Sequence, residues 1–477
     1  MTKICLFGDF FTEGPFGRLP YKFIGPLVKS FEIPLYVPYV LTEDLLRVTS
    51  NLDKKLECIP WEPSCHNFNI HSHLVHNLDL TPYDFYHISF QYARLYRPSE
   101  SCSFSQELLS IFGSITFWKV VLLRHKIDLV ISLFPPHFVY DYTFLVACRI
   151  LGIPFRTYLP ISLAPERKFL VDMHSKTPVE CETSDTNNFP FDYQAIHSED
   201  APFQSYTQSS LNIMNKVKID AKKILKSGFT ENSKHYKYTN FFNSMVHEYQ
   251  SVLSKSSSIK NLCLAKTDKC ILVTLHMQPE ASTSPCGLIP DQRHVVHLLA
   301  STFPDHTILV KEHPIQLLFL TTNRSHLYSN KTGFRFNGYY TSMLSRKNVI
   351  FISAYASIND IMSSYNIQAL ATYSGSPAVS ALVKKIPVIS FGIAAYTGYR
   401  GVISFNNHPS LDLRSELLVA SDYLKNISSV EDDLRNHMQS LSFPWHFAQT
   451  DRNGTSLTSD DLLKESLNAI YYALKSI

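Results

Sequence analysis

Short apolar runs that alternate with helical patterns predict parallel β-strands in the second half of the chain. Five runs have the length and composition of buried strands: 271–275, 307–310, 348–353, 368–373 and 387–391. Helical patterns at 357–364 and 377–383 lie between the later runs, and Pro290 and Asp291 mark the start of an earlier helix. Strands and helices that alternate at this spacing are typical of right-handed βαβ units, so this half predicts a doubly wound domain.

The first half of the chain repeats this pattern less regularly. An apolar run at 4–7 enters a glycine-bounded loop at 8–15. Helical patterns and strand-like runs then alternate along four segments: 108–124, 127–134, 142–151 and 154–159. This alternation predicts a second parallel sheet. The predicted fold class is therefore α/β, with two Rossmann-like, doubly wound domains.

Length and local composition indicate where these domains divide. A chain of 477 residues is long enough for two large domains. Residues 175–205 are polar and weakly periodic, as in a long loop, a Lys-rich helical pattern follows at 209–253, and the Ser-rich segment 254–258 has the composition of a linker. We therefore expect three parts: an N-terminal domain with a helical insertion at 1–258, a C-terminal domain at 259–455, and an amphipathic helix at 456–477 that packs back on the first domain.

Composition and charge exclude several classes of protein. With 45% hydrophobic and 18% charged residues, the chain is globular rather than disordered, and its net charge of +3 is too small and too spread to indicate nucleic-acid binding. A basic run at 216–226 predicts either a solvated helix face or attachment to an anionic membrane surface. The nine cysteines show no paired spacing, and no secretory leader or run of eighteen apolar residues appears. We expect a cytoplasmic protein with reduced thiols, at most peripheral at the inner face of the membrane.

Two polar clusters follow predicted strands at the point where each strand ends. Residues 275–280 read LHMQPE, and residues 310–314 read VKEHP. Because the loops that leave the carboxyl ends of parallel strands line one edge of the sheet, both clusters should lie on the same rim. Polar groups beside apolar strands are costly to place unless something binds to them, so His276, Gln278 and Lys311 are candidate ligand-binding residues.

A third polar loop, SGSP at 374–377, is expected between a strand and a helix. In that setting the first amides of the helix point outwards and favour an anion. A glycine turn with a serine N-cap and a proline at the first helical position accounts for the same residues without a ligand. The predicted position on the rim of the two histidine clusters favours anion binding by Ser374, Gly375 and Ser376.

The residue types in these loops suit phosphate and sugar chemistry. The imidazole of His313, next to Lys311, can neutralise a phosphate oxygen that becomes a leaving group, although a lone histidine is more often structural. An extended chain would place Gln278 and Glu280 on one side, where an amide can recognise a sugar hydroxyl or carboxylate and a carboxylate can act as a general base. Helix capping or a salt bridge is the alternative role of Glu280.

The amino-terminal loop supplies two further candidates for a base. Asp9 and Glu13 would face the cleft if the two domains close on each other, and either could activate an acceptor; a solvated turn is the alternative. The region around 276–313 is rich in histidine but contains no HExxH spacing, so no metal is expected. GxGxxG, Walker A and GxSxG signatures are also absent, which disfavours a dehydrogenase, a P-loop NTPase or a serine hydrolase.

Taken in order, these motifs resemble the bacterial capsule polysaccharide biosynthesis family. The resemblance spans residues 270–392 and is carried by the segments 275–285, 291–292, 310–314, 374–376 and 385–392. Members of that family resemble GT-B glycosyltransferases and include Kdo transferases recognised by a His-Pro and a Gln-Pro motif. The resemblance implies two GT-B-like domains that face a central cleft. It also implies that His313 contacts the donor phosphate, that Gln278 lies near the donor sugar, and that Ser374 to Ser376 hold phosphate or nucleotide.

One position departs from the pattern of many GT-B proteins. These carry a glutamate on the helix after the glycine turn, where it binds the ribose diol of a UDP-type donor, and the matching position here is Ser380. This departure favours a CMP-activated acidic sugar, such as Kdo, over a UDP-sugar.

The sequence therefore predicts a glycosyltransferase that moves a sugar from a nucleotide-activated donor to a surface or capsular polysaccharide or a glycolipid. The C-terminal domain would bind the nucleotide sugar, the N-terminal domain would bind the acceptor, and no cofactor is expected beyond the nucleotide-sugar co-substrate. Two alternatives stay open. One is a nucleotide-sugar 2-epimerase, which needs no acceptor, and the other is a non-catalytic GT-B-like protein that binds polysaccharide.

Overall fold

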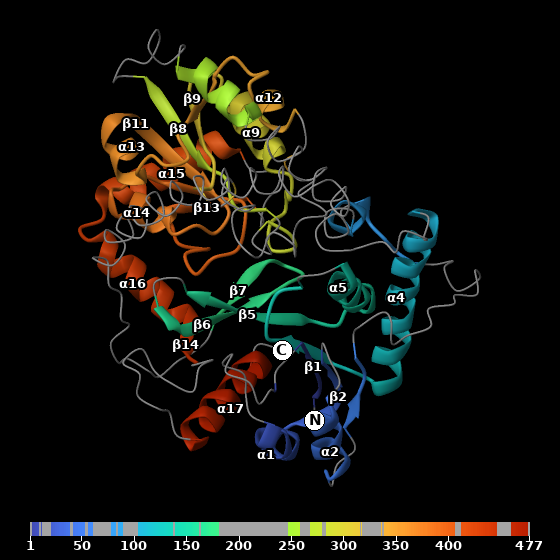
Figure 1. The fold of residues 1–477 in the computed structure, drawn as a ribbon. Helices are drawn as coiled ribbons and strands as arrows, with labels where there is room; N and C mark the ends of the chain where they lie inside the picture. The colour runs from blue at the N-terminus through green and yellow to red at the C-terminus, as the bar shows by residue number, and fades with distance from the viewer. Residues whose placement is uncertain are drawn as a thin grey trace, which may run out of the picture. The chain divides into compact units, whose positions relative to one another are not determined.

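The structure is a computed structural model of the whole chain. It describes residues 2–8, 11, 21–38, 42–52, 56–60, 78–82, 84–88, 104–136, 139–161, 164–180, 247–257, 268–278, 283–314, 316, 335, 338–405, 412–445 and 459–475. These residues divide into two compact α/β units (Figure 1). The first unit contains the described residues up to 180 and those from 434 onwards, and the second contains 247–433. Each unit is built on a sheet with a parallel core, which confirms the predicted pair of Rossmann-like units.

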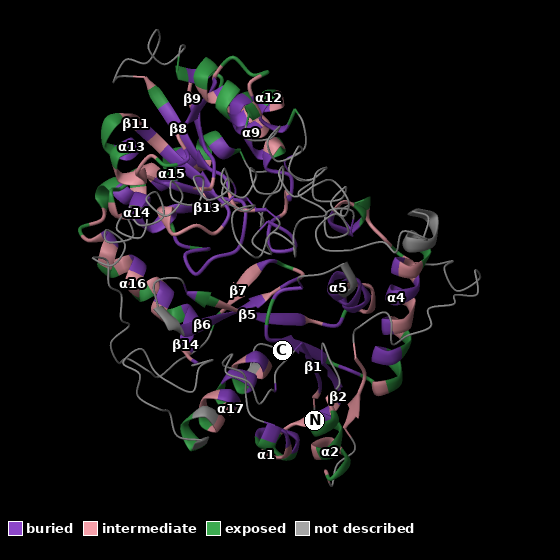
Figure 2. Ribbon diagram, viewed as in Figure 1, coloured by how far each residue is buried: buried purple, intermediate pink, exposed green. Residues whose placement is uncertain are grey.

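The first sheet has a parallel core and an antiparallel extension. Its order is β14-β6-β5-β4-β1-β2-β3, with β7 paired to β6. The parallel strands are β1 (Lys3–Phe7), β2 (Glu32–Val37), β3 (Glu57–Cys58), β4 (Leu129–Ser132) and β5 (Phe155–Ile161). The antiparallel strands are β6 (Ala164–Asp172), β7 (Thr177–Val179) and β14 (Ser442–Pro444). The strands of both sheets are largely buried (Figure 2).

Helices of the first unit bury their apolar faces against this sheet. They are α1 (Ile24–Ser30), α2 (Glu43–Ser50), α4 (Phe104–His125), α5 (Val139–Leu151) and α17 (Ser459–Lys475). α17 is the amphipathic segment at the end of the chain, and its Ala469, Ile470 and Ala473 join the core that lines β1 and β4. The hydroxyl of Tyr158 on β5 donates to the Ala469 carbonyl at 2.9 Å, which ties this helix to the sheet.

The second sheet is fully parallel among its described strands. It contains β8 (Lys269–Thr274), β9 (Thr307–Lys311), β10 (Val349–Ile352), β11 (Asn366–Thr372), β12 (Val388–Ser390) and β13 (Val402–Ser404). The order is β10-β9-β8-β11-β12-β13, so the chain moves outwards from β8 in one direction and from β11 in the other. This is the doubly wound order, and ligands of such sheets bind beyond the carboxyl ends of the strands where the direction reverses.

Helices α9 (Gln292–Thr302), α12 (Tyr339–Met343), α13 (Ile358–Ser364), α14 (Pro377–Val383), α15 (Leu413–Asn426) and α16 (Val430–Leu441) complete the second half. α9 begins as the sequence predicts, because the Asp291 carboxylate caps it by accepting from the Arg293 amide at 3.0 Å. Among the described residues no helix is long and apolar enough to cross a membrane.

The helical residues 247–257 belong to the second unit, although the sequence places the domain boundary after residue 258. Tyr249 and Val252 are buried in the core of the second sheet. The Tyr249 hydroxyl donates to the Ile352 carbonyl at 3.1 Å and accepts from the Ala354 amide at 2.8 Å. The Ser-rich segment that was expected to be a linker is helical through residue 257, because Ser256 is fully buried and accepts from the Phe351 amide at 2.9 Å.

Candidate functional site

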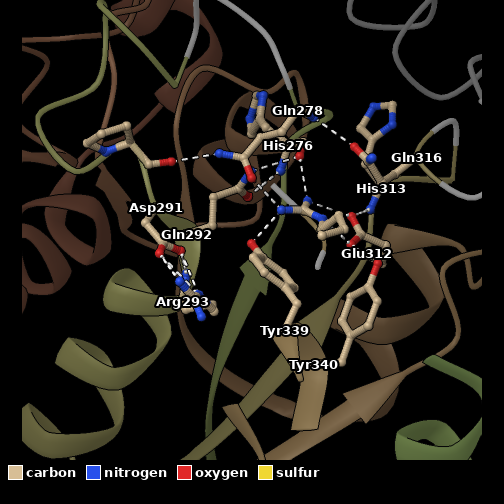
Figure 3. Close-up of polar contacts among 12 residues, drawn as sticks. His276, Gln278, Asp291, Gln292, Arg293, Glu312, His313, Gln316, Tyr339 and Tyr340 are labelled. Atoms are coloured by element: carbon tan, nitrogen blue, oxygen red, sulfur yellow. Dashed lines mark hydrogen bonds and ion pairs between the residues drawn. The ribbon is translucent and has the colours of Figure 1, made fainter. Parts of the chain in front are cut away.

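The candidate site lies where the winding direction of the second sheet reverses, between β8 and β11. These strands pair in parallel although about a hundred residues separate them in the chain. The loops that follow β8, β9 and β11 contain the three polar clusters singled out in the sequence. Figure 3 draws His276 and Gln278 from the loop after β8 and Glu312 and His313 from the loop after β9, with their polar partners. The loop after β11 meets the first of these through the Ser374 amide, which lies 3.4 Å from His276 Nε2. Segments that are distant in the chain therefore come together at one edge of this sheet, as the sequence predicts.

His276, in the loop after β8, contacts the end of β11 through its side chain. Its backbone amide donates to Gln292 Oε1 at 2.7 Å, and Gln292 Nε2 donates back to the His276 carbonyl at 2.9 Å. The ring Nε2 accepts from the Ser374 amide at 3.4 Å and lies 3.1 Å from Thr372 Oγ1. Because the Ser374 amide can only donate, Nε2 is the unprotonated nitrogen and Nδ1 bears the proton of the neutral ring.

The electrostatic surroundings keep the His276 ring neutral. Burial, together with the nearby His313 and Arg335, lowers its pKa from 6.5 to about 3. His276 therefore presents a neutral imidazole at pH 7. An influence of His313 on this pKa also means that the two rings, from the ends of β8 and β9, are electrostatic neighbours.

His313 has a similar character. Burial lowers its pKa from 6.5 to about 4; the adjacent Glu312 opposes this shift, while the positive charges of Lys311 and Arg335 add to it. Its backbone amide donates to Glu312 Oε1 at 2.6 Å, which fixes the start of the loop. Two neutral imidazoles thus stand on adjacent strand ends. Their protonation would become favourable if an anion bound beside them.

The turn at Ser374, Gly375 and Ser376 packs directly against His276. A Cβ atom added to Gly375 would lie 3.0 Å from Thr372 Oγ1 and 3.3 Å from His276 Nε2, so a larger residue would require these two side chains to shift. Ser376 makes no side-chain cap to α14, whereas Pro377 occupies the first turn. The proline part of the capping interpretation therefore holds and the serine part does not.

Gln278 and Lys311 use their polar atoms inside the protein. Gln278 is 2% exposed; its Nε2 donates to the Pro290 carbonyl at 2.6 Å and its Oε1 accepts from Arg335. Lys311 is 6% exposed, and its ammonium donates to the Ala354 carbonyl at 2.5 Å. Through these contacts Gln278 and Lys311 support the loops in which they lie. Direct contact of either residue with a donor stays a prediction.

A buried arginine that no sequence motif indicated lies behind the two histidines. Arg335 and Glu312 are both fully buried and form an ion pair, with Arg335 Nε 3.1 Å from Glu312 Oε2. Tyr339 and Tyr340, at the start of α12, contribute hydroxyl groups to the same cluster. No local pattern marks Arg335, because its partners lie between 4 and 59 residues away in the chain.

Three predicted site residues, Asp9, Glu13 and Glu280, lie outside the described residues, as does the basic run at 216–226. Their roles stay predictions. Within the described ranges no group of three or more His, Cys, Asp or Glu side chains could hold a metal ion. The described part of the site therefore consists of His276, His313 and the turn at 374–376, held from behind by the Arg335 cluster.

Comparison with known proteins gives only distant likenesses. No family model matches the chain, and no curated protein matches it. Among solved structures, the β-Kdo 2,7-transferase KpsC of Thermosulfurimonas dismutans is similar over 82% of this chain and 98% of its own, with 12% identity and a TM-score of 0.30. UDP-GlcNAc 2-epimerase from Neisseria meningitidis is similar over 92% and 99%, with 14% identity and a TM-score of 0.23. Likenesses this weak transfer neither a substrate nor a reaction to this chain.

Proposed function

We propose that the protein is a glycosyltransferase whose second unit binds the nucleotide phosphate of an activated sugar at the carboxyl edge of β8 and β11. The observation that carries the proposal is the position of His276, which bridges to Thr372 and Ser374 where the winding of the sheet reverses. Ligands of doubly wound sheets bind at this place.

The chemistry of the edge suits a phosphate ester. The neutral His276 ring carries its proton on Nδ1, for which no hydrogen-bond partner appears among the described residues, so that N–H is a candidate donor to a phosphate oxygen. The buried Arg335 and Glu312 neutralise each other, and Lys311 adds one positive charge beside them. An anion brought to this edge would therefore meet a positive field and two imidazoles that can take up a proton.

Transfer of the sugar would follow from these contacts. As the bond between the anomeric carbon and the phosphate oxygen breaks, negative charge grows on the phosphate, and His276 and His313 would stabilise it. The acceptor hydroxyl would lose its proton to a carboxylate, for which Glu280, Asp9 and Glu13 remain the candidates. The acceptor would be a surface or capsular polysaccharide or a glycolipid, bound by the first unit.

A CMP-activated acidic sugar of the Kdo type is the donor we favour. α14, which follows the glycine turn, contains no acidic residue, and its Ser380 is buried at 4% exposure. This helix therefore offers no carboxylate to a ribose diol, which UDP-type donors of many GT-B proteins use.

The direct test is thermal unfolding in the presence of CMP, UDP, GDP or ADP, each at 1 mM. A ligand at 100 times its Kd stabilises the folded state by about 2.7 kcal/mol, so CMP should raise the melting temperature by several degrees. His313→Gln should abolish most of the rise, whereas Arg414→Gln, which changes an exposed pair with Asp305, should retain it. A protein that responds to none of the four nucleotides would contradict the proposal.

Incubation with donors separates transfer from the alternatives. With CMP-Kdo and a polysaccharide acceptor, release of CMP should require the acceptor. Conversion of UDP-N-acetylglucosamine alone into a second nucleotide sugar would instead identify a 2-epimerase. Binding of polysaccharide without turnover of any donor would identify a non-catalytic protein.

A further inference from the structure

Arg335 contacts the loops after both β8 and β9 from a fully buried position. Its Nη2 donates to the His276 carbonyl at 3.0 Å and to Glu312 Oε1 at 3.2 Å, and its Nη1 donates to Gln278 Oε1. The guanidinium also lies over the Tyr339 ring, 4.4 Å from its centroid. One planar group therefore links the backbone of His276 to the carboxylate that precedes His313.

Glu312 completes the link to the second histidine. Its Oε1 accepts from the His313 amide at 2.6 Å as well as from Arg335. Its Oε2 accepts from Arg335 Nε at 3.1 Å and from the Tyr340 hydroxyl at 2.7 Å. Within the part of the chain that the structure describes, this carboxylate contacts only the His313 amide, Arg335 and Tyr340. Glu312 is thus placed to orient the start of the His313 loop and not to act as a base.

An ion pair this deeply buried is a poor source of stability. Removing two charges from water costs as much as their attraction returns, and well-packed apolar residues often serve a fold as well or better. The cluster is also placed behind the two rings whose protonation Arg335 opposes by its positive charge. Position and charge together indicate a role in the site.

We propose that Arg335 is a positioning residue: it holds His276 through its carbonyl and His313 through Glu312, so that both imidazoles stand at the spacing that a nucleotide phosphate requires. This inference rests on the proposed function for the identity of the ligand. The geometric part, that one arginine fixes both histidines, stands independently of any ligand.

Arg335→Lys is the primary test, because lysine keeps the charge but cannot make the forked contacts to three groups. In the intact protein, CMP affinity measured by calorimetry should fall at least tenfold. The NMR signals of the His276 and His313 rings should shift, as assigned with His276→Gln and His313→Gln. The matched control Arg414→Lys alters an exposed pair of the same unit and should leave both measurements unchanged.

A second variant keeps the test decisive if Arg335→Lys unfolds. Arg335→Gln combined with Glu312→Gln removes both charges together and leaves no buried charge unpaired. In this variant the pKa of the His276 ring should rise only slightly, since burial and His313, which lower it more than Arg335 does, remain. CMP affinity should again fall at least tenfold.

Two outcomes overturn the positioning role. Ring signals and CMP affinity that stay at wild-type values in a folded Arg335 variant, with only the melting temperature lowered, would make Arg335 purely structural. Histidine ring signals that stay at their wild-type positions in both variants would also show that Arg335 is purely structural, even if the wild-type protein binds no nucleotide. Failure of nucleotide binding with shifted ring signals would instead contradict the proposed function alone.

Discussion

The two sheets share one strand order around their points of reversal, yet their carboxyl edges differ in chemistry. β1 and β4 of the first sheet correspond to β8 and β11 of the second. At the end of β11, Thr372 Oγ1 lies 3.1 Å from the His276 ring of the neighbouring loop. At the end of β4, Ser132 Oγ instead donates to the Phe134 carbonyl at 2.5 Å, within its own loop.

The residues beside Ser132 are mainly apolar. Phe7, the last residue of β1, is fully buried and stacks on Phe144 with ring centroids 4.6 Å apart. Among the described residues, the contacts at the ends of β1 and β4 thus stay within one loop or the apolar core, while the ends of β8, β9 and β11 gather polar groups from three loops. Topology supplies the same kind of edge in both units, and side chains decide which edge becomes a phosphate site.

The largest expected difference between the two units is the loss of stability when an arginine of a buried ion pair is removed. Arg335→Ala leaves the fully buried Glu312 without its countercharge and should cost about 3–5 kcal/mol of unfolding free energy. Arg149→Ala in the first unit should cost about 1 kcal/mol, because its side chain is 31% exposed and Asp84 keeps the Thr81 amide as a partner at 2.8 Å. Urea unfolding followed by circular dichroism measures both. Equal losses would mean that the Arg335 cluster depends on its arginine no more than a pair whose arginine is partly exposed does.

Acid should act on the second edge through its histidines. Folding keeps His313 neutral with a pKa of about 4, whereas the unfolded chain takes up a proton near 6.5, so stability is lost as the pH falls from 6.5 towards 4. The slope is at most about 1.4 kcal/mol per pH unit for one such residue. His313→Gln should flatten the curve between pH 6.5 and 5. An identical pH dependence in wild type and variant would show that His313 is not held neutral.

Two glycine-to-alanine substitutions, one in each unit, test whether CMP binding depends on the close packing around the turn at 374–376. Gly375→Ala should weaken CMP binding about tenfold, or about 1.4 kcal/mol, because its Cβ would press on Thr372 and His276. Gly25→Ala, within α1 of the first unit, meets only Leu52 Cδ2 at 3.6 Å and should leave CMP affinity unchanged. Calorimetry measures CMP affinity in both variants. Unchanged CMP affinity in Gly375→Ala would remove the turn from the site.

The smallest expected difference is in CMP affinity after one hydroxyl is removed at the end of β11 or at the end of β4. Thr372→Val removes the partner of His276 Nε2 and should weaken CMP binding about fivefold, since one such hydrogen bond contributes about 1 kcal/mol. Ser132→Ala removes the loop contact of β4 and should leave CMP affinity at the wild-type value. The reverse result in calorimetry would move the ligand to the first edge.

Much of the second unit could be predicted from the sequence because its strands are apolar on both faces. The runs expected at 307–310 and 368–373 appear as β9 and β11, and α14 has the predicted bounds 377–383. β2, β6 and β14 were not predicted, since their pattern is mixed with polar or proline residues and their pairing joins distant segments. Strand β13, three residues long, is too short for a periodic signal.

The loops singled out in the sequence do come together at one edge of the sheet, whereas the side chains that support them were not predicted. Rules for strand ends place His276, His313 and the 374–376 turn on one edge. These rules do not predict Arg335, because its contacts depend on the tertiary packing that brings α12 against α9. Gln278 was recognised as polar and near the edge, but its buried contact with the Pro290 carbonyl depends on the loop after β8.

Pairing of β14 with β6 makes the first unit discontinuous in the chain. Arg167 on β6 donates to Ser442 on β14, 275 residues further on, and the described residues of the second unit lie between them. A chain that emerges from the ribosome therefore completes its parallel second sheet, residues 269–404, before the first sheet can receive its last strand or helix α17. The half with the proposed phosphate site can mature early, while the first unit waits for the synthesis of residues 442–475.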